Sequence, residues 1–199
     1  MSDDSPLVEE RRAKAARLRQ AGQEPFPWAF PGRVSTESVR LACQKLGPGT
    51  AEPKTSFRVA GRVRAVRGHG KSAFLDLDDL AGTLQLYARV DELGEEGLGR
   101  LLAEIDPGDI VGADGAPLVT RRGEPSLRVS AWQLLAKALH PPPEKFHGLQ
   151  DPEERIRRRY VDLLASAESR TRFRARSLLT RALRRHLDGL GFLEVETPT

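Results

Sequence analysis

The sequence contains very little cysteine and few aromatic residues. Among its 199 residues there is one cysteine, Cys43, and aromatic side chains make up 6%. A single cysteine excludes a framework of disulfides within the chain and any zinc site built on several thiolates. It fits a reducing compartment, so we predict a cytoplasmic protein. The four histidines are scattered, and we identify no metal-ligating cluster.

Long apolar runs are also missing. No stretch approaches the roughly 18–20 apolar residues that a membrane helix needs. The first residues, MSDDSPLVEE, are too acidic and polar for a signal peptide. The sequence therefore predicts no membrane association. Hydrophobic residues still make up 39% of the chain, which is enough for a folded core.

The charges are unevenly distributed. The net charge is +4, but acidic residues dominate residues 89–116, whereas arginine dominates residues 155–185. A basic bias that is segregated in this way favours a nucleic-acid partner. Solvated helix faces would explain the charge runs equally well, so other features have to decide between the two.

A period of two begins at Phe57 and predicts the strands of one small barrel. Three strands of a meander follow each other between residues 57 and 88, separated by turns at 68–71 and 81–82. A helix over about 91–105 comes next, then a strand over 109–120 interrupted at Gly112 and Gly115, and a strand over 126–135. Three strands, a helix and two strands match the order of the OB-fold, a five-stranded Greek-key barrel. The expected class is α+β, mostly β.

Helices are predicted on both sides of this barrel. One covers residues 5–21, and a short one begins at Ser35 or Thr36. After a proline-rich stretch, Asp151 begins a helix to about residue 165, a longer helix covers about 167–190, and residues 192–198 begin a strand. Two helices and the start of a strand cannot close a core, so we expect the beginning of a larger domain there. The predicted divisions are a helical arm and linker (1–52), the OB-fold (53–140), a linker (141–150) and this incomplete domain (151–199).

Two side chains on neighbouring strands suggest a base-binding face. Phe74 alternates with the apolar positions of its strand and therefore faces solvent, and Gln85 lies on the matching face of the next strand. An exposed aromatic ring beside an amide can stack one base and read its edge. The alternative is a phenylalanine packed under a loop.

Other polar residues are candidates of lower specificity. Glu124, at the turn into the last strand, is able to accept from a base or simply to be solvated. The stretch AVRGHGKS at 65–72 resembles a nucleotide loop, but a strand pattern follows it, so a glycine hairpin is the prediction. We find no nucleophile–base arrangement and assign no catalytic residue. Four cations are candidates for the RNA backbone: Arg62, Arg64, Arg67 and Lys71.

Several sequence strings together resemble one family. They are RRAKAARLRQAG at 11–22, GKSAFLDLDDLAGTLQLY at 70–87, GDIVGADG at 108–115, LLAKALHPPPEKFHGLQDPEERIRRRYVDLL at 134–164 and GFLEVETP at 191–198. This resembles the N-terminal part of bacterial class II lysyl-tRNA synthetases, over nearly the whole chain. GFLEVETP resembles motif 1, the dimerisation motif of class II synthetases, which here includes Phe192, Glu194, Glu196 and Pro198.

The resemblance implies an anticodon-reading barrel in an enzyme that uses ATP and Mg²⁺ to attach lysine to tRNA(Lys). In that family the positions of Phe74, Gln85 and Glu124 stack an anticodon base, bond the central uridine and meet the first anticodon position. A homodimer through motif 1 is implied as well. Motifs 2 and 3, which complete the ATP site, would lie beyond Thr199, so we expect no cofactor site and no aminoacylation by these 199 residues alone.

Two departures and two alternatives remain at this level. Pro125 and Ile156 stand where leucine and tyrosine are expected, and proline cannot donate to a strand ladder, which bears on Glu124 beside it. A stand-alone OB-fold RNA-binding protein derived from a synthetase would share these features. A sibling ligase for aspartate or asparagine would differ in its anticodon preference, GUC or GUU against UUU.

Overall fold

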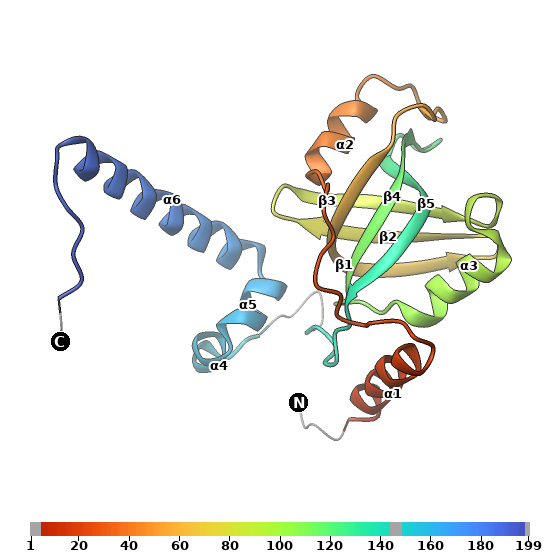
Figure 1. Cartoon of the computed structure of the whole chain (residues 1–199), viewed down its shortest axis with the longest axis horizontal. Coiled ribbons are helices and arrows are strands. Elements are labelled where there is room, and N and C mark those ends of the chain that lie inside the picture. Colours follow the sequence, from red (N-terminus) through yellow and green to blue (C-terminus); the bar gives the residue numbers. More distant parts are fainter. Residues whose placement is uncertain (1–4, 144–148, 198–199) are drawn as a thin grey trace. The chain divides into compact units, whose positions relative to one another are not determined.

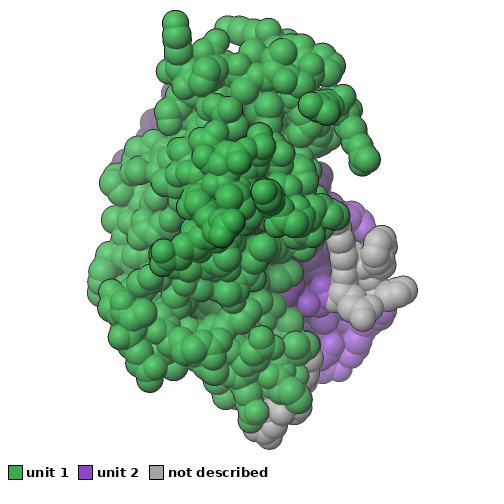
Figure 2. All heavy atoms as spheres, turned by 90° about the vertical axis from the view of Figure 1, so that its right-hand side faces the viewer, with its two compact units in different colours: residues 1–141 green, residues 142–199 purple. Residues whose placement is uncertain are grey.

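The computed structural model describes residues 5–143 and 149–197, which divide into two compact units, 1–141 and 142–199 (Figure 2). Five strands of the first unit form a closed barrel in the order β1-β2-β3-β5-β4 (Figure 1). The strands are β1 (Phe57–His69), β2 (Ser72–Asp79), β3 (Gly82–Arg89), β4 (Ile110–Val119) and β5 (Pro125–Ala136). All neighbours are antiparallel except β3 and β5, which run parallel. The predicted OB-fold class is confirmed.

Alternation along the strands builds the barrel core. Leu75 and Leu77 of β2 and Leu84 and Leu86 of β3 are buried inside, because every second side chain points to the same face. The polar residues between them are left on the outer face. Apolar side chains of α2 (Thr36–Cys43) and α3 (Val90–Glu104) join the same core cluster.

The residues that resemble a nucleotide loop form the hairpin between β1 and β2 instead. Gly70 has a φ of 56°, a left-handed value that glycine adopts without a Cβ clash, and Ser72 pairs with His69 across the turn. A strand rather than a helix follows the turn, so no helix N-terminus is available for phosphates. The prediction of a glycine hairpin is confirmed.

The predicted interruptions of β4 are wrong. The strand is continuous, and its two glycines instead permit close approaches. A Cβ at Gly112 would lie 2.5 Å from the ring of Phe30, and one at Gly115 would lie 2.1 Å from the carbonyl oxygen of Arg128. The ladder shifts register between Asp114 and Gly115, which bends the strand without ending it.

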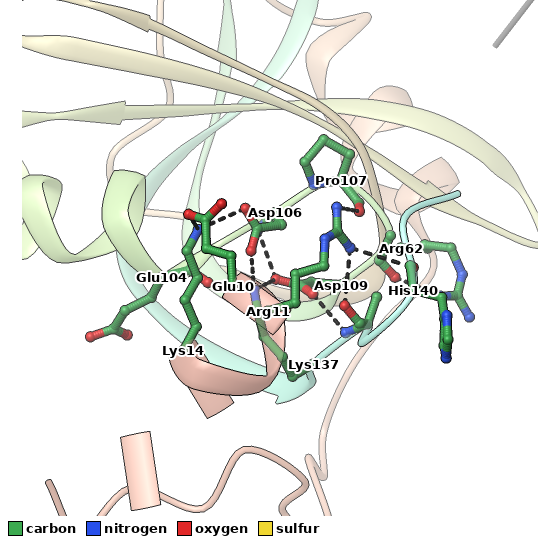
Figure 3. A network of polar contacts seen from close by, with 12 residues as sticks. Glu10, Arg11, Lys14, Arg62, Glu104, Asp106, Pro107, Asp109, Lys137 and His140 are labelled. Atoms are coloured by element: carbon green, nitrogen blue, oxygen red, sulfur yellow. Dashed lines mark hydrogen bonds and ion pairs between the residues drawn. The ribbon is translucent and has the colours of Figure 1, made fainter. Parts of the chain in front are cut away.

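The helix α1 (Pro6–Gln20) is bound to the barrel by a buried polar network (Figure 3). The ammonium of Lys137 is fully buried and donates to Asp106 and Asp109, both at 2.6 Å, and to the carbonyl oxygen of Glu104. Lys14 of α1 donates to the other oxygen of Asp106 at 2.8 Å. All three ammonium protons of Lys137 thus have an acceptor, which burial of the charge requires.

Arg11 extends this network to the segment that leaves the barrel. Its guanidinium donates to the carbonyl oxygens of Pro107 and Ala138, both at 3.0 Å. Asp109 also accepts the backbone N–H of Ala138 at 2.7 Å. The first helix of the unit and its last residues therefore share one set of hydrogen bonds.

The second unit contains three helices, α4 (Pro152–Arg157), α5 (Arg159–Ala165) and α6 (Ala167–Gly189). The predicted single helix from Asp151 to residue 165 is wrong, because the backbone leaves the helical region at Arg158. The break brings Arg155 to the buried carboxylate of Asp162, 2.9 Å away. A straight helix would separate residues seven apart by about 10 Å along its axis.

The predicted strand start at 192–198 is also not observed. Residues 192–197 have no strand structure, and Pro198 lies outside the described residues. A strand needs a hydrogen-bonding neighbour, and none of the described strands pairs with this segment. Among the described helices, none is long and apolar enough to cross a membrane.

Candidate nucleic-acid interface

Two aromatic rings lie against each other on the outer face of β2 and β3. Phe74 and Tyr87 occupy paired positions of the ladder, and their rings stack at 4.7 Å between centroids with planes 9° apart. His69 meets the Phe74 ring edge-on at 6.3 Å. Both stacked residues are half-buried. Phe74 is therefore packed against a second ring, and the pair forms a ready stacking surface.

Gln85 lies on the same face, two residues before Tyr87. The parallel ladder pairs it with Ser126 of β5. The Ser126 hydroxyl donates to Gln85 Oε1 at 3.0 Å. The amide is thereby held in a defined orientation beside the aromatic pair.

The turn between β4 and β5 brings Glu124 to this face. Glu124 is exposed, and the turn is closed by hydrogen bonds between Thr120 and Glu124 in both directions, each at 3.0 Å. Pro125 is the first residue of β5. Proline is compatible with that position.

These residues line one open cleft of about 990 Å³. Of the residues singled out in the sequence, Phe74, Gln85, Glu124 and Arg67 come together there. A phenylalanine–tyrosine pair, an amide and a carboxylate in one open cleft suit a planar ligand with polar edges. Further cations line the same cleft: Arg89, Arg121 and Arg122.

The cations of the cleft differ in their partners. Arg67 donates to both oxygens of Asp76, at 2.6 and 2.8 Å, and this hydrogen bonding raises the pKa of its guanidinium. Arg89 is paired with Asp91 and lies over the Tyr87 ring. Arg121 and Arg122 are exposed, and among the described residues no carboxylate pairs with either.

The other three predicted backbone contacts do not line the cleft. Arg62 donates to the carbonyl oxygen of Gly108 at 2.6 Å, and burial is the largest cause of its lowered pKa. Arg64 lies 3.4 Å from a carboxylate oxygen of Asp78. Lys71 is exposed at the β1–β2 hairpin.

Sequence reasoning missed Tyr87, Arg121 and Arg122. Tyr87 lies two residues after Gln85 in the same strand, so strand alternation could have placed it on the same face. The two arginines directly precede Gly123 in the turn before Glu124, and their approach to the cleft depends on how β4 and β5 close the barrel. No local pattern shows that closure.

The predicted motif 1 residues lie in the second unit. Phe192 is exposed, and Glu194 pairs with Arg184 of α6 at 2.9 Å. Glu196 is exposed. Several leucines of α6 are exposed as well: Leu178, Leu179, Leu183 and Leu187.

Comparisons with known proteins agree with this architecture. Residues 57–135 match the family described as OB-fold nucleic acid binding domain, and residues 151–199 match the class II tRNA synthetases (D, K and N). The chain is 41% identical over 193 residues to the lysine–tRNA ligase of Dehalococcoides mccartyi, an alignment that covers 96% of the chain. The chain is a homologue of the lysine–tRNA ligases.

Other lysine–tRNA ligases give the same result. Identity is 42% with that of Lysinibacillus sphaericus and 43% with that of Moorella thermoacetica, each over 98% of the chain. The chain spans 38–39% of the length of these relatives. The resemblance inferred from the sequence strings is therefore confirmed, for the part of the ligases that this chain represents.

Proposed function

We propose that the barrel binds the single-stranded anticodon of tRNA(Lys), as part of an enzyme that attaches lysine to that tRNA. The observation that carries the proposal is the cleft in which Phe74, Tyr87, Gln85 and Glu124 meet on the outer face of an OB-fold. The names of the relatives supply the amino acid and the tRNA. ATP and Mg²⁺ belong to the reaction of that family.

Each group in the cleft has a distinct task in this proposal. A base stacks on the aromatic pair formed by Phe74 and Tyr87, and Gln85 bonds the edge of the central base. Glu124 accepts from an amino or imino group of a neighbouring base. Arg121 and Arg122 meet the phosphates, which fix the position of the loop without selecting a sequence.

A homodimer is the second part of the proposal. Exposed leucines of α6 and the exposed Phe192 offer apolar surface in the second unit. Contiguous apolar surface of this kind is typical of protein–protein contacts. Motif 1 residues Phe192, Glu194, Glu196 and Pro198 are proposed to contribute to this contact.

Binding of anticodon stem-loops tests the function. Phe74→Ala removes a stacking partner and is expected to weaken binding of a UUU stem-loop by about 1–3 kcal/mol. The barrel is expected to stay folded, because the Phe74 side chain lies outside the core. A titration followed by fluorescence anisotropy measures the affinity, and circular dichroism measures the thermal midpoint.

Trp28→Ala is the matched control. Trp28 is a fully exposed aromatic residue outside the cleft, so its removal is expected to leave binding unchanged. Equal binding by Phe74→Ala and the parent would refute the proposed base-stacking site. Preference for GUC or GUU over UUU would instead indicate a sibling ligase.

A further inference from the structure

Ser126 is buried directly beside the amide of Gln85. It is the second residue of β5, its side chain has no exposure, and the parallel ladder pairs it with Gln85. Its hydroxyl oxygen lies 3.0 Å from Gln85 Oε1. The serine therefore has no access to a ligand in the cleft, but it touches a residue that has.

The hydroxyl proton has two acceptors within reach. The second is the carbonyl oxygen of Glu124 at 3.2 Å, which already accepts the backbone N–H of Thr120 at 3.0 Å. A hydroxyl has one proton, and the shorter contact to an oxygen without another donor takes it. The carbonyl oxygen of the Gln85 amide is thus satisfied inside the protein.

The consequence is a fixed polarity in the cleft. An amide whose oxygen is held by a donor presents its NH₂ group to whatever lies in front of it. Uracil offers the O4 acceptor where cytosine offers the N4 amino donor. The NH₂ group of Gln85 can donate to O4 of uracil. In front of cytosine it faces the N4 amino group, which is also a donor and cannot accept.

We propose that Ser126 is a positioning residue that makes Gln85 select a base with a carbonyl edge, uracil over cytosine. This inference rests on the proposed function, because it assigns the source of specificity at the same site. Ser126 touches no RNA. It acts by holding one of the two orientations of the Gln85 amide.

The experiment compares UUU and UCU stem-loops on five forms of the full chain: the parent, Ser126→Ala, Ser126→Thr, Gln85→Glu and Gln85→Ala. The parent is expected to prefer UUU by about tenfold, within the range that one well-placed base contact provides. Ser126→Ala frees the amide to rotate, and the preference is expected to fall to about twofold. Ser126→Thr keeps a hydroxyl and is expected to retain the preference.

Gln85→Glu gives the sharpest result. The Ser126 hydroxyl still donates to one oxygen, so the other oxygen presents an acceptor to the base. The preference is then expected to reverse toward UCU. The added negative charge weakens both complexes equally, so the ratio of the two dissociation constants isolates the effect.

The outcomes separate this inference from the proposed function. If Ser126→Ala keeps the parental ratio while Gln85→Ala loses it, Gln85 reads the base but Ser126 does not position it, and the inference fails alone. If Gln85→Ala keeps the ratio, Gln85 reads no base and the inference fails, whereas the proposed function is still decided by whether Phe74→Ala weakens stem-loop binding. A Gln85→Glu chain that still prefers UUU contradicts the inference. Thermal midpoints within a few degrees of the parent confirm that each variant is folded.

Discussion

An arginine side chain is available to an RNA phosphate only where the protein has not already paired it. Arg67 lines the cleft, but both oxygens of Asp76 hold its guanidinium. Arg121 and Arg122 lie on a turn whose backbone is closed by its own hydrogen bonds. A cation on a fixed turn loses less conformational freedom on binding, so this pair is the better phosphate contact.

Removal of these two charges is expected to change the salt dependence of binding. Each phosphate contact contributes about 0.7 to the slope of log K against log salt concentration for single strands. Arg121→Ala and Arg122→Ala together should therefore reduce the slope by about 1.4 while the UUU to UCU ratio stays constant. Stem-loop titrations at several KCl concentrations measure both quantities.

Arg33→Ala provides the control for this charge effect. Arg33 is exposed and lies outside the cleft, so the slope should remain that of the parent. A double variant with an unchanged slope would show that Arg121 and Arg122 do not meet phosphates.

Single residues were predictable where the strand period determines a face. Phe74 and Gln85 follow from alternation alone, and the structure places both in the cleft. The stacking of Tyr87 on Phe74 depends on ladder register, and the bond from Ser126 to Gln85 depends on a parallel pairing between distant strands. Neither contact leaves a local signature, so sequence reasoning could not find them.

At the level of elements, α1 is attached through charges as well as through the buried apolar side chains Val8, Ala15 and Leu18. Asp106 lies between Lys14 and Lys137. Burial by itself would raise the pKa of Asp106, but the hydrogen bonds and charges of these two lysines outweigh it, so the pKa is lowered from 3.8. A carboxyl group with a lowered pKa stabilises the fold above its usual pKa, and this contribution is lost as the pH falls through the folded value.

Asp106→Asn is therefore expected to destabilise the chain in a pH-dependent way. Near neutral pH the free energy of unfolding should fall by about 1–3 kcal/mol, since hydrogen bonds to charged groups are lost. The difference in the free energy of unfolding between variant and parent should shrink as the pH falls below about 3.8, where the carboxyl group protonates in the unfolded chain. Urea denaturation at pH 7, 5 and 3.5 measures this difference.

Glu95→Gln is a suitable comparison, because Glu95 is an exposed acid of α3. It should show little change at any of these pH values. A difference for Asp106→Asn that stays constant with pH would contradict the ion-pair explanation.

The period of two located all five strands, and the capping residue Asp151 located the start of α4, where its side chain accepts from the N–H of Glu153. The break at Arg158 was not predicted, because it goes with an ion pair between Arg155 and the buried carboxylate of Asp162 that a continuous helix would not allow. The continuity of β4 was not predicted, because its glycines permit close approach of other residues rather than ending the strand. In each case a tertiary contact decided what the local pattern left open.

Across the whole molecule, the two units differ in how much of their side-chain surface is buried. The barrel encloses a continuous core, whereas many side chains of α6 are exposed. Amide hydrogen exchange should therefore be at least about tenfold faster in 152–189 than in 57–136, because few buried contacts oppose local opening. Mass spectrometry of the full chain measures this difference, and equal protection of both regions would contradict it.

The bonds of α1 also impose an order on biosynthesis. Arg11 donates to the carbonyl oxygen of Ala138, 127 residues later in the chain. A ribosome that adds about 5–20 residues per second needs on the order of ten seconds to make that stretch. Lys14 and Arg11 can already meet Asp106 and Pro107 within this interval, but the bonds of Arg11 to Ala138 and of Lys137 to Asp106 and Asp109 form only at its end. The hydrogen bonds of α1 are thus complete only after the last residues of the barrel unit have been made.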